Sequence, residues 1–235
     1  MRVFIRVLGL TAVLVVAAVA RDDAPSALEK DPDGWTDLLA KTDSKLTGWM
    51  RAPLPAWGKL NDQTQWSLDS ATGHLVCHGD RGHEWLRWDK ELGDCIFHVE
   101  WRFTVVPGKK GYNSGVYARN SADAAIYHQA QTGDASGGYL FGNTLEHGIA
   151  KRFNLSKQQP KSRVKPAGEW NVFEITCQGK EMSLWVNGAI ANRWTDCEVT
   201  KGYVGLEAEG FRIEFRNVKV KPLEGANDGK TKTSD

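Results

Sequence analysis

One segment of this chain alternates strictly between apolar and polar side chains, and this period of two limits the fold more than any other feature. In residues 95–104 the apolar positions are Phe97, Val99, Trp101 and Phe103, and the polar positions are His98, Glu100, Arg102 and Thr104. Successive side chains of a β-strand point to opposite faces, so one face of this strand is predicted to be buried and the other to be polar.

Several other short runs have the same strand-like composition and are separated by turn signals. We expect further strands near residues 66–68, 74–77, 85–88, 115–119, 125–131, 169–177, 182–186, 203–209 and 211–220. Asn187-Gly188 is the strongest hairpin signal, because both residues of such a turn adopt positive φ. No amphipathic helix is evident beyond the first 20 residues, so the sequence predicts an all-β sandwich or barrel.

The N-terminus has the pattern of a secretory signal peptide over residues 1–20. Arg2 and Arg6 precede an apolar run, and Ala18-Val19-Ala20 resembles a cleavage site. We therefore predict a secreted or periplasmic protein. The remaining chain divides into a flexible lead-in (21–33), a single β-sandwich domain (34–223) and a disordered tail (224–235).

Net charge and hydropathy narrow the choice of partners. The whole chain carries a formal charge of +1 at pH 7, and losing Arg2 and Arg6 with the signal peptide would leave about −1. Such a chain lacks the basic surface that nucleic acid requires. No segment after the signal is apolar enough to span a membrane. Neither nucleic acid nor membrane is therefore an expected partner, and the oligomeric state is left open.

Four cysteines could form two disulfides in an exported protein. Their spacing favours Cys77 with Cys95 and Cys177 with Cys197, and buried free thiols are the alternative. The chain has no CxxC pair, and the spacing of His74, His78 and His83 matches no standard metal motif. We predict no cofactor or metal, although a divalent cation is not excluded.

Residues 111–119 concentrate polar side chains around a glycine. Alternation would place Asn113, Tyr117 and Arg119 on one face, with Gly115 leaving room for a ligand or a backbone. Other strands offer more candidates of the same kind, namely Glu100, Arg102, Gln129, Gln131, Glu207 and Glu209. If these strands are neighbours in one sheet, their polar faces suit a sugar, because guanidinium and amide groups bind hydroxyls. The alternative is a solvated face with cross-strand ion pairs.

Several motifs together resemble the 3-keto-disaccharide hydrolase domain family of bacteria. The sequence lacks the GxSxG, P-loop and HExxH signatures of other enzyme classes. The similarity runs from about residue 34 to 223 and rests on short motifs in order. They are Gly34-Trp35, Leu46-Thr47-Gly48-Trp49, Asn113-Ser114-Gly115 with Arg119, Gly168-Glu169-Trp170-Asn171, and Gly205-Leu206-Glu207-Ala208-Glu209-Gly210.

This resemblance implies a two-sheet antiparallel jelly roll of the concanavalin A type, export, and action on carbohydrates. Family members are linked to cleavage of glycosides already oxidised at C3 of the sugar. A 3-keto group acidifies the C2 proton, so a carboxylate base could remove it while an acid protonates the departing oxygen at C1. Addition of water would complete a net hydrolysis.

The sequence departs from the family pattern at two places. The family has a Glu-x-Gln pair where this chain has Gln129-Ala130-Gln131, and many members have Gln and His where this chain has Glu207 and Glu209. We therefore expect Glu100 or Glu209 to be the base. The predicted substrate-binding residues are Arg102, Asn113, Tyr117, Arg119, Gln129, Gln131 and Glu207. A lectin-like binding module and an adhesion domain are the alternative functions.

Overall fold

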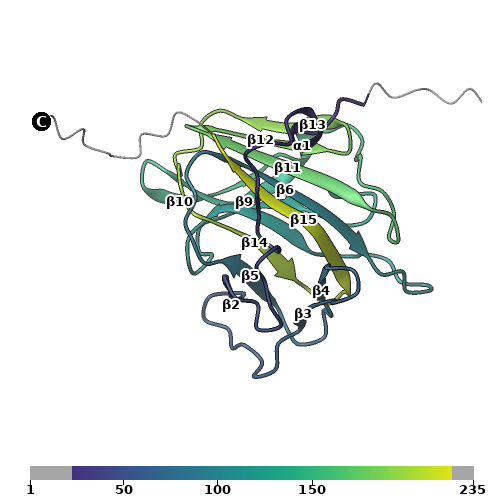
Figure 1. Cartoon of the computed structure of the whole chain (residues 1–235). Coiled ribbons are helices and arrows are strands. Elements are labelled where there is room, and N and C mark those ends of the chain that lie inside the picture. Colours follow the sequence, from purple (N-terminus) through teal and green to yellow (C-terminus); the bar gives the residue numbers. More distant parts are fainter. Residues whose placement is uncertain (1–22, 224–235) are drawn as a thin grey trace, which may run out of the picture.

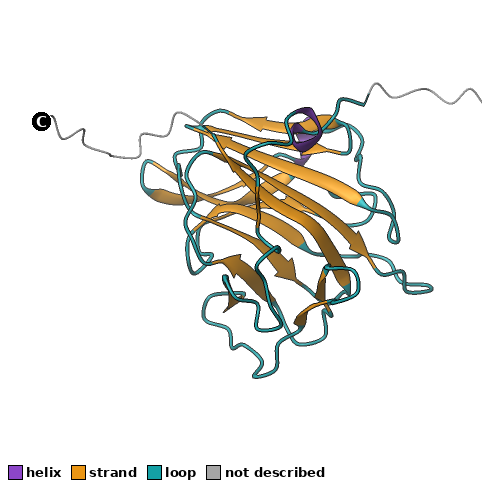
Figure 2. Cartoon of the chain, viewed as in Figure 1, coloured by secondary structure: helices purple, strands orange, loops and turns teal. Residues whose placement is uncertain are grey.

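Two antiparallel sheets pack face to face in the computed structural model of this protein, which describes residues 23–223 (Figure 1). Helical structure within these residues is limited to the four-residue α1 (Ala27–Lys30) and the 3-10 turn η1 (Ser156–Gln158) (Figure 2). The predicted all-β sandwich of the jelly-roll type is therefore confirmed.

The eight-stranded sheet has the order β13-β12-β11-β6-β15-β4-β3, with β1 also paired to β15. Its strands are β1 (Thr36–Asp37), β3 (Trp66–Leu68), β4 (Leu75–Cys77), β6 (Cys95–Phe103), β11 (Asn171–Gln178), β12 (Glu181–Val186), β13 (Ala189–Trp194) and β15 (Ile213–Pro222). The strand nearest the C-terminus, β15, thus lies inside this sheet, between β6 and β4.

The seven-stranded sheet has the order β10-β9-β8-β7-β14-β5-β2. Its strands are β2 (Trp49–Pro53), β5 (Glu84–Trp88), β7 (Gly115–Asn120), β8 (Tyr127–Gln131), β9 (Leu140–Glu146), β10 (Ile149–Asn154) and β14 (Tyr203–Ala208). Here too a late strand, β14, occupies an interior position, between β7 and β5.

The apolar face of β6 lies in the core between the two sheets. Phe97, Val99, Trp101 and Phe103 are each at most 1% exposed, which confirms the period of two predicted for residues 95–104. Val116 of β7 and Leu206 of β14 belong to the same apolar cluster from the opposing sheet. The polar faces of β6 and of β7 and β14 consequently point away from each other.

This arrangement corrects one expectation from the sequence. The polar residues of β6 were expected to share a surface with those of β7, β8 and β14. They do not, because β6 belongs to the eight-stranded sheet and the other three strands belong to the seven-stranded sheet. A sandwich has two outer faces on opposite sides of its core, and each face carries part of the predicted set.

The segment before the domain is partly structured. Ser26 and Glu29 form a capping box at the start of α1. The backbone N–H groups of Ala27 and Leu28 donate to the Glu174 carboxylate of β11 at 2.6 and 3.1 Å. A flexible lead-in was expected for residues 21–33, whereas its described part is attached to the sheet. The predicted signal peptide (1–20) and tail (224–235) lie outside the described residues.

No helix within residues 23–223 has the length and apolar character needed to cross a membrane.

The cysteines are free and buried, and the expected disulfide pairing is wrong. Both β4 and β6 pair with β15, but Cys77 lies opposite Ile213 while Cys95 lies opposite Pro222, about 30 Å further along that strand. Cys95 instead faces Cys177 across the β6–β11 ladder. Cys197 follows β13, and its thiol contacts the Val199 carbonyl at 3.4 Å.

Thiol titration tests this assignment. In the folded protein we expect slow reaction with an aromatic disulfide reagent, because all four thiols are buried and burial raises the pKa of Cys77 to about 12. Unfolding in guanidinium chloride without reductant should release four reactive thiols per chain. Release of fewer than four from freshly purified protein would contradict the structure.

Candidate functional site

A cavity of about 600 Å³ opens on the outer face of the seven-stranded sheet. Polar side chains of β7, β8 and the end of β14 form one part of its lining, together with His83. The loop 54–57, the turn 124–125 and two aromatic residues of β8 and β9 form the other part. This size falls in the range of pockets that bind small molecules.

Strand alternation places the polar residues in this cavity. Val116, Ala130 and Leu206 face the core, so the residues on either side of each of them face outward. The ladders then set their order, because Tyr117 pairs with Gln129 on one side and with Gly205 on the other. The outward residues therefore gather above the centre of the sheet.

Gly115 makes room for a neighbouring side chain. A Cβ atom at this position would lie 2.2 Å from the amide nitrogen of Gln129, so any larger residue would collide with it. The sequence suggested that a ligand or a backbone approaches this glycine. The structure instead places the Gln129 side chain over it, which lets the Gln129 amide reach across to β14.

Glu207 is the most highly hydrogen-bonded carboxylate of the cavity. Its Oε1 accepts from the Tyr117 hydroxyl at 2.6 Å and lies 2.8 Å from His83 Nε2, and its Oε2 accepts from Gln129 Nε2 at 2.6 Å. Only 3% of Glu207 is exposed. A buried carboxylate requires such donors, because burial without them would disfavour its charge.

The charge of Glu207 affects its neighbours. Its hydrogen bond to His83 raises the pKa of the imidazole, which favours the protonated ring. Burial, together with the same negative charge, raises the pKa of Tyr117 well above its ordinary value. Tyr117 therefore remains a hydroxyl donor over the whole physiological range of pH.

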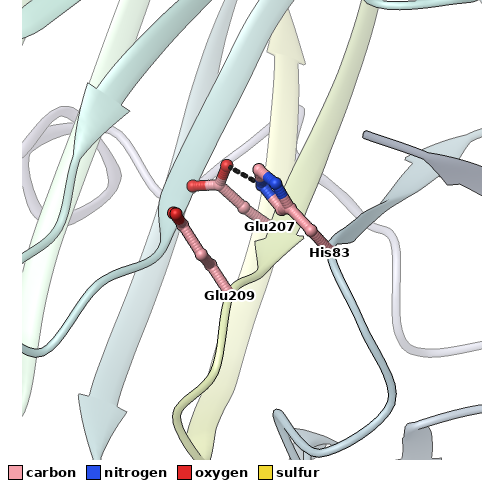
Figure 3. Close-up of side chains that lie close together, drawn as sticks. All are labelled: His83, Glu207 and Glu209. Atoms are coloured by element: carbon pink, nitrogen blue, oxygen red, sulfur yellow. Dashed lines mark hydrogen bonds and ion pairs between the residues drawn. The ribbon is translucent and has the colours of Figure 1, made fainter. Parts of the chain in front are cut away.

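Glu209 is partly exposed, whereas Glu207 is buried, and both carboxylates lie close to His83 (Figure 3). It accepts one hydrogen bond from Asn113 Nδ2 at 2.5 Å, and Asn113 is itself held by the Gln131 amide. Burial and the nearby charge of Glu207 raise the pKa of Glu209. A carboxylate with a raised pKa is a stronger base, and its partial exposure leaves it open to a ligand.

His83, Glu207 and Glu209 lie close enough together to bind one cation. Each offers a donor atom, and the three atoms lie within 4.8 Å of one another. One imidazole and two carboxylates are ligands that Zn²⁺ or Mn²⁺ accepts, and this number would leave positions open for water or a substrate. The same three groups could equally transfer protons.

The polar residues of β6 lie outside this cavity, on the outer face of the eight-stranded sheet. Glu100 accepts hydrogen bonds from Arg216 Nε at 2.7 Å and from Asn217 Nδ2 at 2.6 Å. Burial opposes its charge, but the nearby His98 imidazole and the hydrogen bonds from Asn217 and Arg216 lower its pKa to about 2. Glu100 is thus a carboxylate held in ion pairs, away from the pocket in which we expected it.

Arg102 and Arg119 are also separate from the cavity. Arg102 donates to Glu214 at 2.8 Å and stacks on the Trp170 ring. Arg119 has a φ of 54°, and the pairing of β7 with β14 shifts register beside it, between Tyr203 and Gly205. This bulge breaks the alternation, so the Arg119 side chain is 2% exposed and donates to Asp94 at 3.1 Å.

The cavity therefore gathers most of the candidates named from the sequence. They are Asn113, Tyr117, Gln129, Gln131, Glu207 and Glu209. His83 and the loop 54–57, including Trp57, were missed. His83 contacts Glu207 across 124 residues of sequence, so no local pattern could have paired them. The only sequence signal that could have pointed to His83 was its position directly before β5.

A protein-family model matches residues 30–221, which is most of the chain. Its description is a 3-keto-alpha-glucoside-1,2-lyase-like domain. A comparison with curated proteins gave no match.

Solved structures with the same architecture include both enzymes and binding modules. A candidate glycosyl hydrolase from Parabacteroides distasonis has a TM-score of 0.58 at 18% identity, covering 87% of this chain and 100% of that one. The carbohydrate-binding module CBM66 from Bacillus subtilis has a TM-score of 0.54 at 14% identity (74% and 96% covered). A Bacillus licheniformis β-glucanase has a TM-score of 0.50 at 13% identity (79% and 95%). At sequence identities this low, these matches show a shared fold alone.

Gln129 and Glu207 contact each other across the sheet, and compared with the family pattern the amide and the carboxylate have exchanged positions. The family resemblance predicts a glutamate at 129 and a glutamine at 207, the reverse of this chain. We expect Gln129→Glu alone to destabilise the fold by about 2 kcal/mol, because two carboxylates would share one buried contact. Adding Glu207→Gln should restore one carboxylate and one amide. Denaturant unfolding of the two single variants and the double variant measures the coupling free energy between positions 129 and 207. If the unfolding free-energy changes of the two single variants simply add up to that of the double variant, the exchange is contradicted.

Glu100 should contribute to stability. Because its pKa is lowered to about 2, its ionised form stabilises the fold above the ordinary carboxyl pKa of about 4.5, and this contribution is lost as the pH falls toward 2. Allowing for solvent screening, we expect Glu100→Gln to cost about 1 kcal/mol at pH 7 and progressively less in acid. Thermal unfolding across pH measures this difference, and a difference that does not change with pH would refute the assignment.

Proposed function

Because this chain belongs to the 3-keto-alpha-glucoside-1,2-lyase-like domain family, we propose that it cleaves glycosides oxidised at C3 of the sugar by elimination. The observation that carries this proposal is the placement of Glu209 beside the His83–Glu207 pair in one cavity. A carboxylate and a protonated imidazole are the base and the acid that such an elimination needs.

Glu209 is the proposed base. The C3 ketone of the substrate makes the C2 proton acidic, and the ionised Glu209 carboxylate removes it to give the enolate. Glu209 suits this role better than Glu207, because Glu207 already accepts three hydrogen bonds and is almost fully buried. The raised pKa of Glu209 strengthens it as a base.

His83 is the proposed acid. As the enolate electrons form the C1–C2 double bond, the bond from C1 to the glycosidic oxygen breaks. His83 transfers a proton to that oxygen, which leaves as an alcohol. The carboxylate of Glu207 keeps His83 protonated and oriented, so Glu207 acts as a positioning residue. Addition of water across the new double bond would complete a net hydrolysis.

The amides of the cavity would hold the sugar. Asn113 and Gln131 form a connected pair beside Glu209, and both can exchange hydrogen bonds with hydroxyl groups. We further propose that the protein acts outside the cytoplasm, on the strength of the signal-like pattern in residues 1–20.

A lectin-like binding module is the second candidate function. It is favoured by Gln129, which stands where the family resemblance predicts a glutamate and which has no basic group. In this case the cavity would bind a glycan without changing it.

The decisive assay measures product release from 3-keto-glucosides. We expect turnover by the wild type, a loss of at least about 100-fold in Glu209→Gln, and a comparable loss in His83→Gln, since each removes a proton-transfer group. Glu100→Gln is the matched control, because the same substitution lies outside the cavity, and it should retain activity. Saturable binding without turnover in the wild type would instead support the lectin-like function.

The pH profile and the metal requirement separate two mechanisms at this site. For proton transfer, kcat/KM should fall in acid as Glu209 is protonated and in alkali as His83 is deprotonated, and both limbs should be displaced upward by the raised pKa values. Activity should survive chelation. Activity that is lost on chelation and restored by Mn²⁺ would assign the three side chains to a metal instead.

A further inference from the structure

The cavity contains two regions of opposite chemistry. The polar region holds Glu209, His83 and the amides that would bind the oxidised sugar. The apolar region is formed by the loop 54–57, the turn 124–125, Tyr127 and Phe141. Since the bond to be cleaved must lie beside Glu209 and His83, a sugar in the polar region directs its leaving group toward the apolar region.

The apolar region offers few partners for hydroxyl groups. Its side chains are Leu54, Pro55, Ala56, Trp57, Ala124, Ala125, Tyr127 and Phe141. The polar side-chain atoms among them are the Trp57 indole nitrogen and the Tyr127 hydroxyl, whose oxygen already accepts from Arg152 at 3.3 Å.

The backbone of the turn is also satisfied internally. The N–H groups of Ala124 and Ala125 donate to Ser121 and Asp123, and the Ala125 carbonyl accepts from Asn143. In the loop, Leu54 N–H donates to the His83 carbonyl, and Pro55 has no N–H to offer. The backbone N–H groups of the turn and of Leu54 are therefore already paired within the protein.

Aromatic rings extend this region away from Glu209. Tyr117 meets Tyr127 edge to face with ring centroids 6.4 Å apart, and Tyr127 meets Phe141 in the same way at 6.2 Å. Trp57 lies at the rim and is 85% exposed. A large aromatic residue left so open to water on the wall of a cavity is well placed to cover a flat apolar ligand.

A second sugar would fit this region poorly. Each hydroxyl buried there without a partner would lose its hydrogen bonds to water and weaken binding. An apolar group would instead strengthen binding in proportion to the surface that it removes from water. These two terms act in the same direction.

We propose that the leaving group of the substrate is an aromatic aglycone rather than a second sugar. This inference rests on the proposed function for the placement of the 3-keto sugar in the polar region. It names phenolic glycosides oxidised at C3 as the substrate class. The Trp57 and Phe141 rings hold the aglycone, while Glu209 and His83 act on the bond that joins it to C1.

Two measurements keep this inference distinct from the proposed function. The first compares kcat/KM for phenyl 3-keto-glucoside and for a 3-keto-disaccharide, and we expect the phenyl compound to be favoured at least about 10-fold. The second measures calorimetric binding of unoxidised phenyl glucoside and of an unoxidised disaccharide, and it requires no turnover. Here too we expect the phenyl compound to bind about 10-fold more tightly.

Variants of the apolar region provide the mechanistic test. Trp57→Ala and Phe141→Ala should each weaken phenyl glucoside binding about 5-fold or more and weaken disaccharide binding by a smaller factor. Ile149→Ala is the control, because Ile149 is 72% exposed on β10 and does not line the cavity. Tight binding of the phenyl compound without turnover would overturn the proposed function and retain the aromatic site. Equal preference, or failure of both ligands to bind, would overturn the inference.

Discussion

The buried carboxylate of Glu207 is the constraint on which the rest of the site depends. A charge that is 3% exposed needs hydrogen-bond donors, and three surrounding side chains supply them. Each donor is thereby held in place: Tyr117 as a hydroxyl, His83 with its pKa raised by the hydrogen bond, and Gln129 folded over Gly115. The carboxylate that would carry the chemistry, Glu209, is set against this rigid group. One buried charge thus determines both the shape and the electrostatics of the cavity.

The fold could be predicted from the sequence because the signal for it is local. Alternation in residues 95–104 identifies a strand with one buried face, and Asn187-Gly188 identifies a hairpin, which the structure places between β12 and β13. Sheet membership is not local, and nothing in β6 alone indicates that it pairs with β11 and β15 rather than with β7. The hairpin of β9 and β10 was not among the expected strands, because residues 133–168 are rich in glycine and polar groups and show no clear alternation.

The same distinction separates the site residues that were anticipated from those that were not. Tyr117, Gln129 and Glu207 follow the alternation of their strands, so their outward direction could be predicted. Arg119 sits at a bulge with positive φ, and a single extra residue redirected its side chain into the interior. Glu100 points outward as the alternation of its strand predicted, but that strand belongs to the eight-stranded sheet and not to the sheet that carries the cavity. His83 and Trp57 lie on loops, where periodicity carries no information about direction.

The positions of β14 and β15 have a consequence for how the chain is made. Each lies inside its sheet, although they are the last two strands in sequence. The seven-stranded sheet cannot close before β14 has been synthesised, nor the eight-stranded sheet before β15, because β7 and β5, and β6 and β4, have no direct ladder between them. Nascent protein therefore lacks a complete half that could fold early, and its high contact order favours slow folding after release. The two sheets therefore form late, after the strands that join their halves have been synthesised.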